Sequence, residues 1–147
     1  HAGWRGLAGV GGEGVLESVT ESFWHFPSVE RSQPAMKKVA SNTLAWLGPC
    51  IGPQAFEVGT EVRDAFCAAD ARAARCFTAL GGGKFLADLP GLARQRLNGL
   101  GVTAIYGNDG SPAWCTFGNR ARYFSHRRDA LALGGSGRMA ACVWLAD

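Results

Sequence analysis

The sequence predicts an α/β (α+β) domain in which helices cover a layered, mixed sheet. Short apolar runs at 44–47 and 102–106 are bounded by turn residues and have the length of strands. Segments with apolar residues at helical spacing, at 13–24, 60–70 and 90–100, are interspersed with them. The chain has 147 residues, 47% apolar and 18% charged, which is enough for one compact domain with a buried core.

Boundary signals support the expected helices. Thr60 is a suitable N-cap for the helix over 60–70. Pro90 suits the first turn of the helix that follows it, and Gly101 suits the C′ position at its end. The residues Gly81-Gly82-Gly83 predict a turn, because the spacing and the missing Ser/Thr exclude a phosphate-binding loop.

The strands are fewer than a complete sheet needs. We expect a buried strand at 44–47, another strand at 102–106, and a closing strand over Met139–Leu145 that is buried on both faces. A turn is expected at Asn108-Asp109-Gly110. So few strands leave an edge or an apolar face uncovered, and we expect a preceding N-terminal segment to cover it.

Composition restricts the classes of partner and compartment. The net charge is only +3, and the late arginines suit a phosphate or carboxylate better than a long nucleic acid. No apolar stretch is long enough to span a membrane. The number of cysteines is odd and no CxxC pair occurs, which indicates reduced thiols in a cytoplasmic protein. The late arginines are Arg120, Arg122, Arg127, Arg128 and Arg138, and the cysteines are Cys50, Cys67, Cys76, Cys115 and Cys142.

Histidine is scarce, and one of the three lies in a distinctive setting. The string His1-Ala2-Gly3-Trp4-Arg5-Gly6 has small residues around an aromatic ring and an arginine, which indicates a tight strand-to-helix turn. Such a turn would direct the His1 imidazole and the Arg5 guanidinium into a cleft. The alternative is a frayed terminal histidine without a role. His25 and His126 are expected to be solvated surface residues.

Short motifs spread along the chain resemble one known family. The string at 1–6 is similar to the signature of the laccase-domain family, the multicopper polyphenol oxidase-like or YfiH-like proteins. Further matches follow in the order of the family, over 1–16 and 44–145. They are the residues 47–53 (LGPCIGP), 56–59 (FEVG), 87–89 (ADL), 115–116 (CT), 124–129 (FSHRRD) and 137–140 (GRMA).

The resemblance implies a fold and a metal centre. The family fold is a single α/β domain of a cysteine-hydrolase-like class, of which residues 1–147 would be the C-terminal part. The family site resembles a zinc or copper centre made by two histidines and one cysteine. Only the second histidine maps onto this sequence, at His1, and the other two ligands would lie upstream of it.

The resemblance also implies chemistry. Family members are described as phosphorolysing purine nucleosides and deaminating adenosine, and earlier as oxidising polyphenols. We therefore expect a zinc-dependent enzyme, with copper possible, that takes a purine nucleoside and phosphate, and whose activity requires the complete protein. Arg5 is the first candidate for binding phosphate. Arg127 and Arg128 are further candidates, although either could instead pair with Asp129 or Glu57.

Two other readings remain open at this stage. A free amino-terminal histidine can chelate copper through its amine and its ring, which would make the protein a secreted oxidase. The chain could also be an inactive, truncated homologue that binds no metal. The oligomeric state does not follow from the sequence.

Overall fold

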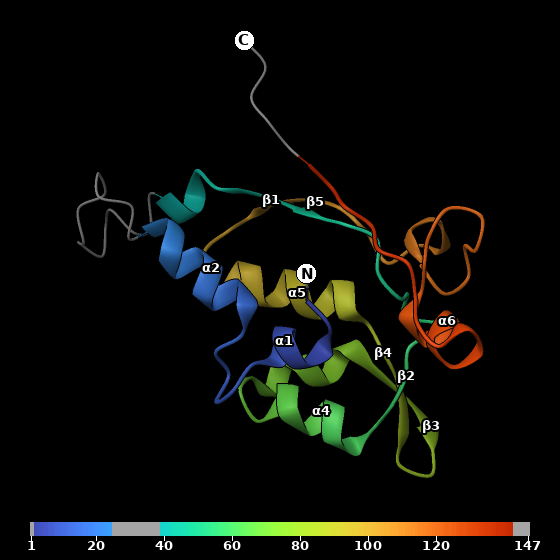
Figure 1. Cartoon of the computed structure of the whole chain (residues 1–147). Helices are drawn as coiled ribbons and strands as arrows, with labels where there is room; N and C mark the ends of the chain where they lie inside the picture. The colour runs from blue at the N-terminus through green and yellow to red at the C-terminus, as the bar shows by residue number, and fades with distance from the viewer. Residues whose placement is uncertain (1, 25–38, 143–147) are drawn as a thin grey trace.

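A computed structural model describes residues 2–24 and 39–142 of the chain. Helices and short strands follow one another along it (Figure 1), and both parallel and antiparallel strand pairs occur, so the α/β class is confirmed. The elements are α1 (Trp4–Ala8), α2 (Val15–Trp24), β1 (Leu44–Leu47), β2 (Glu57–Gly59), α4 (Thr60–Cys67), η1 (Ala71–Cys76), β3 (Phe77–Gly81), β4 (Lys84–Ala87), α5 (Leu89–Gly99), β5 (Ala104–Gly107), η2 (Pro112–Trp114) and α6 (His126–Leu133).

The strands of the described residues form two small sheets. Strands β1 and β5 pair in parallel, with Leu44 opposite Ala104. The other sheet is antiparallel in the order β2-β4-β3. The β3–β4 hairpin turns through Gly81, Gly82 and Gly83, whose φ angles of 92°, 57° and 74° favour residues without a side chain. The predicted turn is confirmed, and the two strands on either side of it were missed.

The core lies where the helices meet the antiparallel sheet. Helix α5 occupies the middle of the molecule, between the β1–β5 pair and the layer that contains α1 and α4 (Figure 1). Its Leu92 is 1% exposed, and Phe66 from α4 is 2% exposed. Leu7 and Ala8 of α1 belong to the same cluster, which fixes the signature segment at the start of the chain against the core. No helix in the described ranges is long and apolar enough to cross a membrane.

Local capping explains where α5 begins and ends. The Asp88 side chain accepts a hydrogen bond of 2.9 Å from the Gly91 N–H, and Pro90 lies in the first turn. Gly101 follows the C-cap with φ +85°, so the predicted C′ role is confirmed. Helix α4 differs from its prediction, since Gly59 is the N-cap and Thr60 is the first helical residue.

The prediction that residues 44–47 are a buried strand was correct about the strand and wrong about its burial. Leu44 is 63% exposed and Trp46 is 50% exposed. Tyr106, directly opposite Trp46 in the parallel register, is 56% exposed. Alternate residues of a strand point to opposite faces, and only the other face, where Leu47 lies, meets the core.

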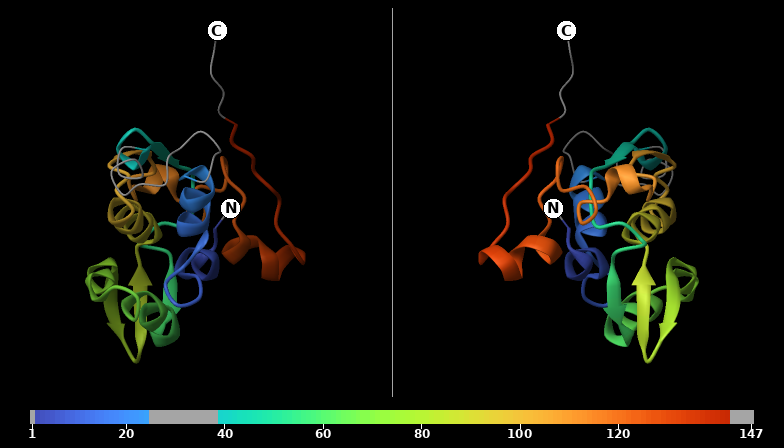
Figure 2. Two further views of the ribbon diagram at one scale, coloured as in Figure 1. Left: turned by 90° about the vertical axis from the view of Figure 1, so that its left-hand side faces the viewer. Right: turned by 90° about the vertical axis from the view of Figure 1, so that its right-hand side faces the viewer.

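The predicted closing strand is also wrong for the residues that the structure describes. Residues 139–142 form no strand, and the Met139 side chain is 49% exposed. The side views show that this stretch and α6 stand to one side of the other elements (Figure 2). An apolar run becomes a strand only where a neighbour completes its hydrogen bonds, and no described strand pairs with it. Residues 143–145 of the prediction lie outside the described residues.

An ion pair in the partly buried region between α2 and α5 joins the N-terminal segment to the rest of the fold. The Arg96 guanidinium binds both Glu17 carboxylate oxygens, with Nε–Oε1 at 3.0 Å and Nη2–Oε2 at 2.9 Å. It also donates to the carbonyl oxygens of Ala8 and Gly12. Burial raises the pKa of Glu17, but the hydrogen bonds from Arg96 and the Gly14 N–H outweigh it, so the pKa stays below its ordinary value.

We predict that Arg96→Met lowers the free energy of unfolding by roughly 2–4 kcal/mol. The substitution leaves the Glu17 carboxylate with only the Gly14 N–H and removes the donor to two carbonyl oxygens, at a site where Arg96 is only 12% exposed. Urea denaturation followed by circular dichroism measures the loss. Arg72→Met is the control, because Arg72 is 70% exposed and pairs with Asp70 at the surface. Equal losses in the two variants would contradict this account.

Candidate functional site

Two motif-bearing loops cross beside the core. The Thr116 N–H donates to the Cys50 carbonyl oxygen at 2.8 Å, in an isolated parallel bridge between Cys50 and Cys115. The Gly52 N–H donates to the Cys115 Sγ at 3.2 Å. A Cβ at Gly52 would lie 3.1 Å from the Cys115 Cβ, so the close approach favours glycine. The motifs at 47–53 and 115–116, which are far apart in the sequence, therefore lie side by side in the fold.

Asn108 holds this crossing from the end of β5. Its side chain is 2% exposed, and its Nδ2 donates to the Gly48 carbonyl oxygen at 3.1 Å and to the Cys50 Sγ at 3.4 Å. Its Oδ1 accepts from the Gly110 N–H at 2.9 Å, as in the predicted turn. Every polar atom of the amide therefore has a partner inside the fold, which is what a buried amide requires.

The two thiols at the crossing differ in environment. Burial raises the pKa of the Cys50 thiol to about 11, more than the hydrogen bond from Asn108 lowers it, so Cys50 stays protonated at neutral pH. The Cys115 Sγ accepts two backbone N–H groups, from Gly52 at 3.2 Å and from Gly118 at 3.4 Å. The Cys115 Sγ therefore links the loop that contains Gly52 to the turn that follows Cys115 in its own loop.

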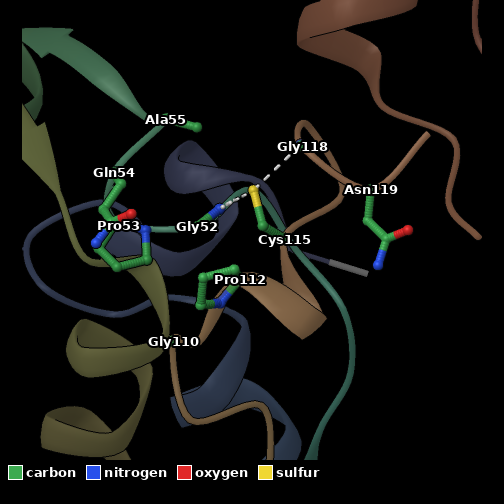
Figure 3. A pocket seen from close by; sticks show the side chains of 9 residues that line it. All are labelled: Gly52, Pro53, Gln54, Ala55, Gly110, Pro112, Cys115, Gly118 and Asn119. Atoms are coloured by element: carbon green, nitrogen blue, oxygen red, sulfur yellow. Dashed lines mark hydrogen bonds between the residues drawn. The ribbon is translucent and has the colours of Figure 1, made fainter.

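A pocket of about 320 Å³ opens over Cys115. Figure 3 shows Cys115 in the middle of its lining, with Gln54 on one side and Asn119 on the other. The lining consists of glycines, prolines, one alanine, one cysteine and two amides: Gly52, Pro53, Gln54, Ala55, Gly110, Pro112, Cys115, Gly118 and Asn119. Sequence reasoning found the two loops but missed Gln54 and Asn119, because neither amide belongs to a motif with a known chemical meaning.

The signature segment forms α1, on which Arg5 is exposed. The Arg5 guanidinium lies over the Trp4 ring, with the guanidinium carbon 4.6 Å from the ring centroid. It makes no hydrogen bond to the residues that the structure describes. His1 lies outside the described residues, so the expectation that its imidazole and Arg5 share a cleft stays a prediction.

Arg128 is a structural residue in this fold. An arginine has five N–H groups, and all five of Arg128 donate to protein acceptors. Two donate to the Asp129 carboxylate at 2.7 and 2.9 Å. The other three donate to the carbonyl oxygens of Thr116, Phe117 and Tyr123 at 2.7–3.0 Å. The sequence left two roles open for Arg128, and the structure shows the one in which it pairs with Asp129. None of its donors remains for phosphate.

Arg127 and His126 lie at the surface of α6. Arg127 donates to the Glu57 carbonyl oxygen at 3.0 Å and lies over the Phe56 ring at 5.4 Å. His126 is exposed, as expected. Within the described ranges no group of three His, Cys, Asp or Glu residues could hold a metal ion, and His25 lies outside those ranges.

This α/β fold and the order of its motifs correspond to one protein family. The family model described as multi-copper polyphenol oxidoreductase laccase matches residues 1–146, so the chain belongs to this laccase-domain family.

Curated relatives carry a more specific name. The chain is 46% identical over 145 residues to the purine nucleoside phosphorylase YfiH of Escherichia coli (strain K12), with 99% of this chain and 49% of the relative covered. It is 45% identical over 148 residues to the purine nucleoside phosphorylase PA4543 of Pseudomonas aeruginosa, with 100% of this chain and 51% of the relative covered. The chain therefore spans about half the length of these relatives.

Solved structures share the fold. The Neisseria meningitidis protein NMB0706 is 44% identical and superposes with a TM-score of 0.69, over 88% of this chain and 45% of that chain. YlmD from Geobacillus stearothermophilus is 25% identical, with a TM-score of 0.67 over 92% of this chain and 45% of that chain.

The hydrogen bonds of Arg128 predict a large stability effect from a conservative substitution. Arg128→Lys keeps the charge but loses the fork of donors to Asp129 and three carbonyl oxygens, so we expect the free energy of unfolding to fall by roughly 2–3 kcal/mol. The neighbouring Arg127→Lys is the matched control and should cost well under half as much, because Arg127 is exposed and makes one hydrogen bond. Chemical denaturation compares them, and an Arg128→Lys variant as stable as the control would overturn the structural role.

Proposed function

We propose that this chain supplies the C-terminal half of a purine nucleoside phosphorylase of the laccase-domain family. The similarity of nearly the whole chain to relatives of that name supports the proposal most directly. The pocket over Cys115 adds to it, since its volume of about 320 Å³ falls in the usual range of small-molecule sites, roughly 300–1,000 Å³. The substrates would be a purine nucleoside and phosphate.

The proposal includes a metal ion, zinc in the first place and copper as the alternative. His1 would be one ligand, and such a centre would supply a Lewis acid at an open coordination position. The described residues do not make this centre by themselves, since they contain no group of three suitable side chains. A second histidine and a thiolate would have to come from other parts of a complete protein, and we assign no reaction step to the metal.

Arg5 is the residue we propose for the phosphate. Its guanidinium is exposed, stacks on Trp4 and makes no hydrogen bond to the described residues. Its N–H groups can therefore bind an anion. Stacking on the ring would hold the planar group in one orientation, which favours a bidentate contact with phosphate oxygens. Arg128 has no donor left for phosphate, and Arg127 is a weaker candidate because it already donates to the Glu57 carbonyl oxygen.

The remaining parts of the proposal are adenosine deamination as a second reaction of the same centre, and a cytoplasmic location. The five cysteines are free, which is consistent with a reducing compartment. Metal analysis separates this proposal from the two alternatives. Copper bound stoichiometrically by the 147-residue chain alone would favour the N-terminal copper site, and a folded complete protein without metal would favour an inactive homologue.

In a complete protein that contains this chain, we expect His1→Ala to lower both the metal content and the phosphorolysis of inosine by at least tenfold. Metal content is measured by elemental analysis, and hypoxanthine release by chromatography. His126→Ala is the matched control, because His126 is exposed on α6 and should leave both values unchanged. An unaltered metal content in His1→Ala would remove His1 from the centre.

We expect the isolated 147-residue chain to lack phosphorolysis of inosine, because a single imidazole binds a transition metal poorly. The assay compares hypoxanthine release by the chain alone and by the complete protein at equal concentration, with and without added zinc. Turnover by the chain alone at the rate of the complete protein would show that the upstream ligands are not needed.

A further inference from the structure

We propose that the pocket over Cys115 holds the base of the purine nucleoside, and that the amides of Gln54 and Asn119 determine which base is accepted. The inference rests on the proposed function and adds to it the place and the specificity of base binding. Neither amide lies in a motif, and both reach the pocket from the loops that cross at Cys50 and Cys115 (Figure 3).

The lining carries no formal charge that would select phosphate. None of the nine residues is a lysine, arginine or histidine, and none is an aspartate or glutamate. Phosphate sites normally provide cationic side chains or a helix N-terminus. The two prolines, Ala55 and the glycines offer apolar surface, which suits the faces of an uncharged, flat ring system. The pocket therefore fits the base of the substrate better than its phosphate co-substrate.

Glycines provide the room for a ring. A Cβ at Gly110 would lie 3.7 Å from the Pro53 Cγ, and a Cβ at Gly118 would lie 3.9 Å from the Cys115 Sγ. Side chains at these positions would extend into the space between the loops. Gly118 does not have a positive φ angle, so a larger residue there would reduce the volume without backbone strain.

The two amides can match the edge of a purine. A carboxamide offers an acceptor beside donors, the arrangement with which Asn or Gln binds adenine in a bidentate way. Rotation of the amide by half a turn exchanges donor and acceptor, so that the oxo and N–H groups of hypoxanthine can be matched as well. The Gln54 amide has no hydrogen bond to the described residues. Asn119 Nδ2 makes only a long contact of 3.5 Å with the Ala113 carbonyl oxygen.

The frame that carries these amides is held rigidly. The Cys115 Sγ accepts the N–H groups of Gly52 and Gly118, two and one residues away from Gln54 and Asn119 respectively. The Asn119 N–H donates to the Cys115 carbonyl oxygen at 3.0 Å, so its backbone position does not depend on its side chain. Removal of the amide should therefore change recognition more than structure.

The test uses the complete protein that contains this chain, and titration calorimetry with hypoxanthine and inosine. We expect Asn119→Ala and Gln54→Ala each to raise the dissociation constant for hypoxanthine by about tenfold, the usual value of a lost bidentate contact. The KM for inosine should rise with it, while kcat changes less than threefold. Gly118→Val should weaken binding by at least as much, because it fills the pocket.

The control variant is Asn98→Ala, which removes an exposed amide on α5, away from the pocket lining. It should bind hypoxanthine as the unaltered protein does. Circular dichroism and chemical denaturation confirm that each variant is folded. Dissociation constants unchanged in Asn119→Ala, Gln54→Ala and Gly118→Val would overturn the inference. The inference would also be overturned if the unaltered protein bound hypoxanthine and uracil equally well, or if inorganic phosphate competed with hypoxanthine for binding.

The failure of this inference can be distinguished from the failure of the proposed function. Phosphorolysis of inosine with the same KM in all pocket variants would overturn the base site and leave the proposed function in place. Binding of hypoxanthine that depends on Asn119, in a complete protein without phosphorolysis, would support the base site and contradict the proposed function.

Discussion

The site depends on one crossing, where the backbone at Cys50 meets the backbone at Cys115. A hydrogen bond of 2.8 Å from the Thr116 N–H to the Cys50 carbonyl oxygen sets the register of the two loops. The Gly52 N–H and the Cys115 Sγ, which also form a hydrogen bond, are 63 residues apart in the sequence. The Asn108 amide, 2% exposed, fixes the same crossing from a third segment. Residues from both loops line the pocket over Cys115.

Arginine in this fold mainly satisfies backbone carbonyl oxygens. Arg94 donates to the carbonyl oxygens of Ile105 and Asn108 at the end of β5, and Arg96 to those of Ala8 and Gly12. Arg128 gives three of its five donors to carbonyl oxygens in the 116–123 loop. A cluster of arginines in the sequence therefore overstates the capacity to bind anions, because irregular loops leave carbonyl oxygens that a guanidinium can satisfy. Arg5 instead lies over the Trp4 ring and makes no hydrogen bond to the residues that the structure describes.

The sequence predicted the features that depend on a few adjacent residues. The first-turn proline of α5, the glycine after its C-cap, the glycine turn and the start of α2 follow from local backbone chemistry, and the structure confirms them within one or two residues. It did not predict β3 and β4, although a Gly-Gly turn between runs of apolar residues is a hairpin signal. The burial of 44–47 and the strand at 139–142 were wrong, because both depend on partners elsewhere in the chain.

By itself, the sequence determined the family of this protein, the α/β class, the two glycine-containing turns and the end of α5, since ordered motifs and local propensities do not depend on distant contacts. Only the tertiary structure decided that Arg128 has no donor left over, that Leu44 and Trp46 face outward, and that Gln54 and Asn119 share a pocket. Each of these depends on which groups far apart in the chain come together to satisfy one another's hydrogen bonds and bury apolar surface. That pairing is a property of the folded chain and cannot be read from neighbouring residues.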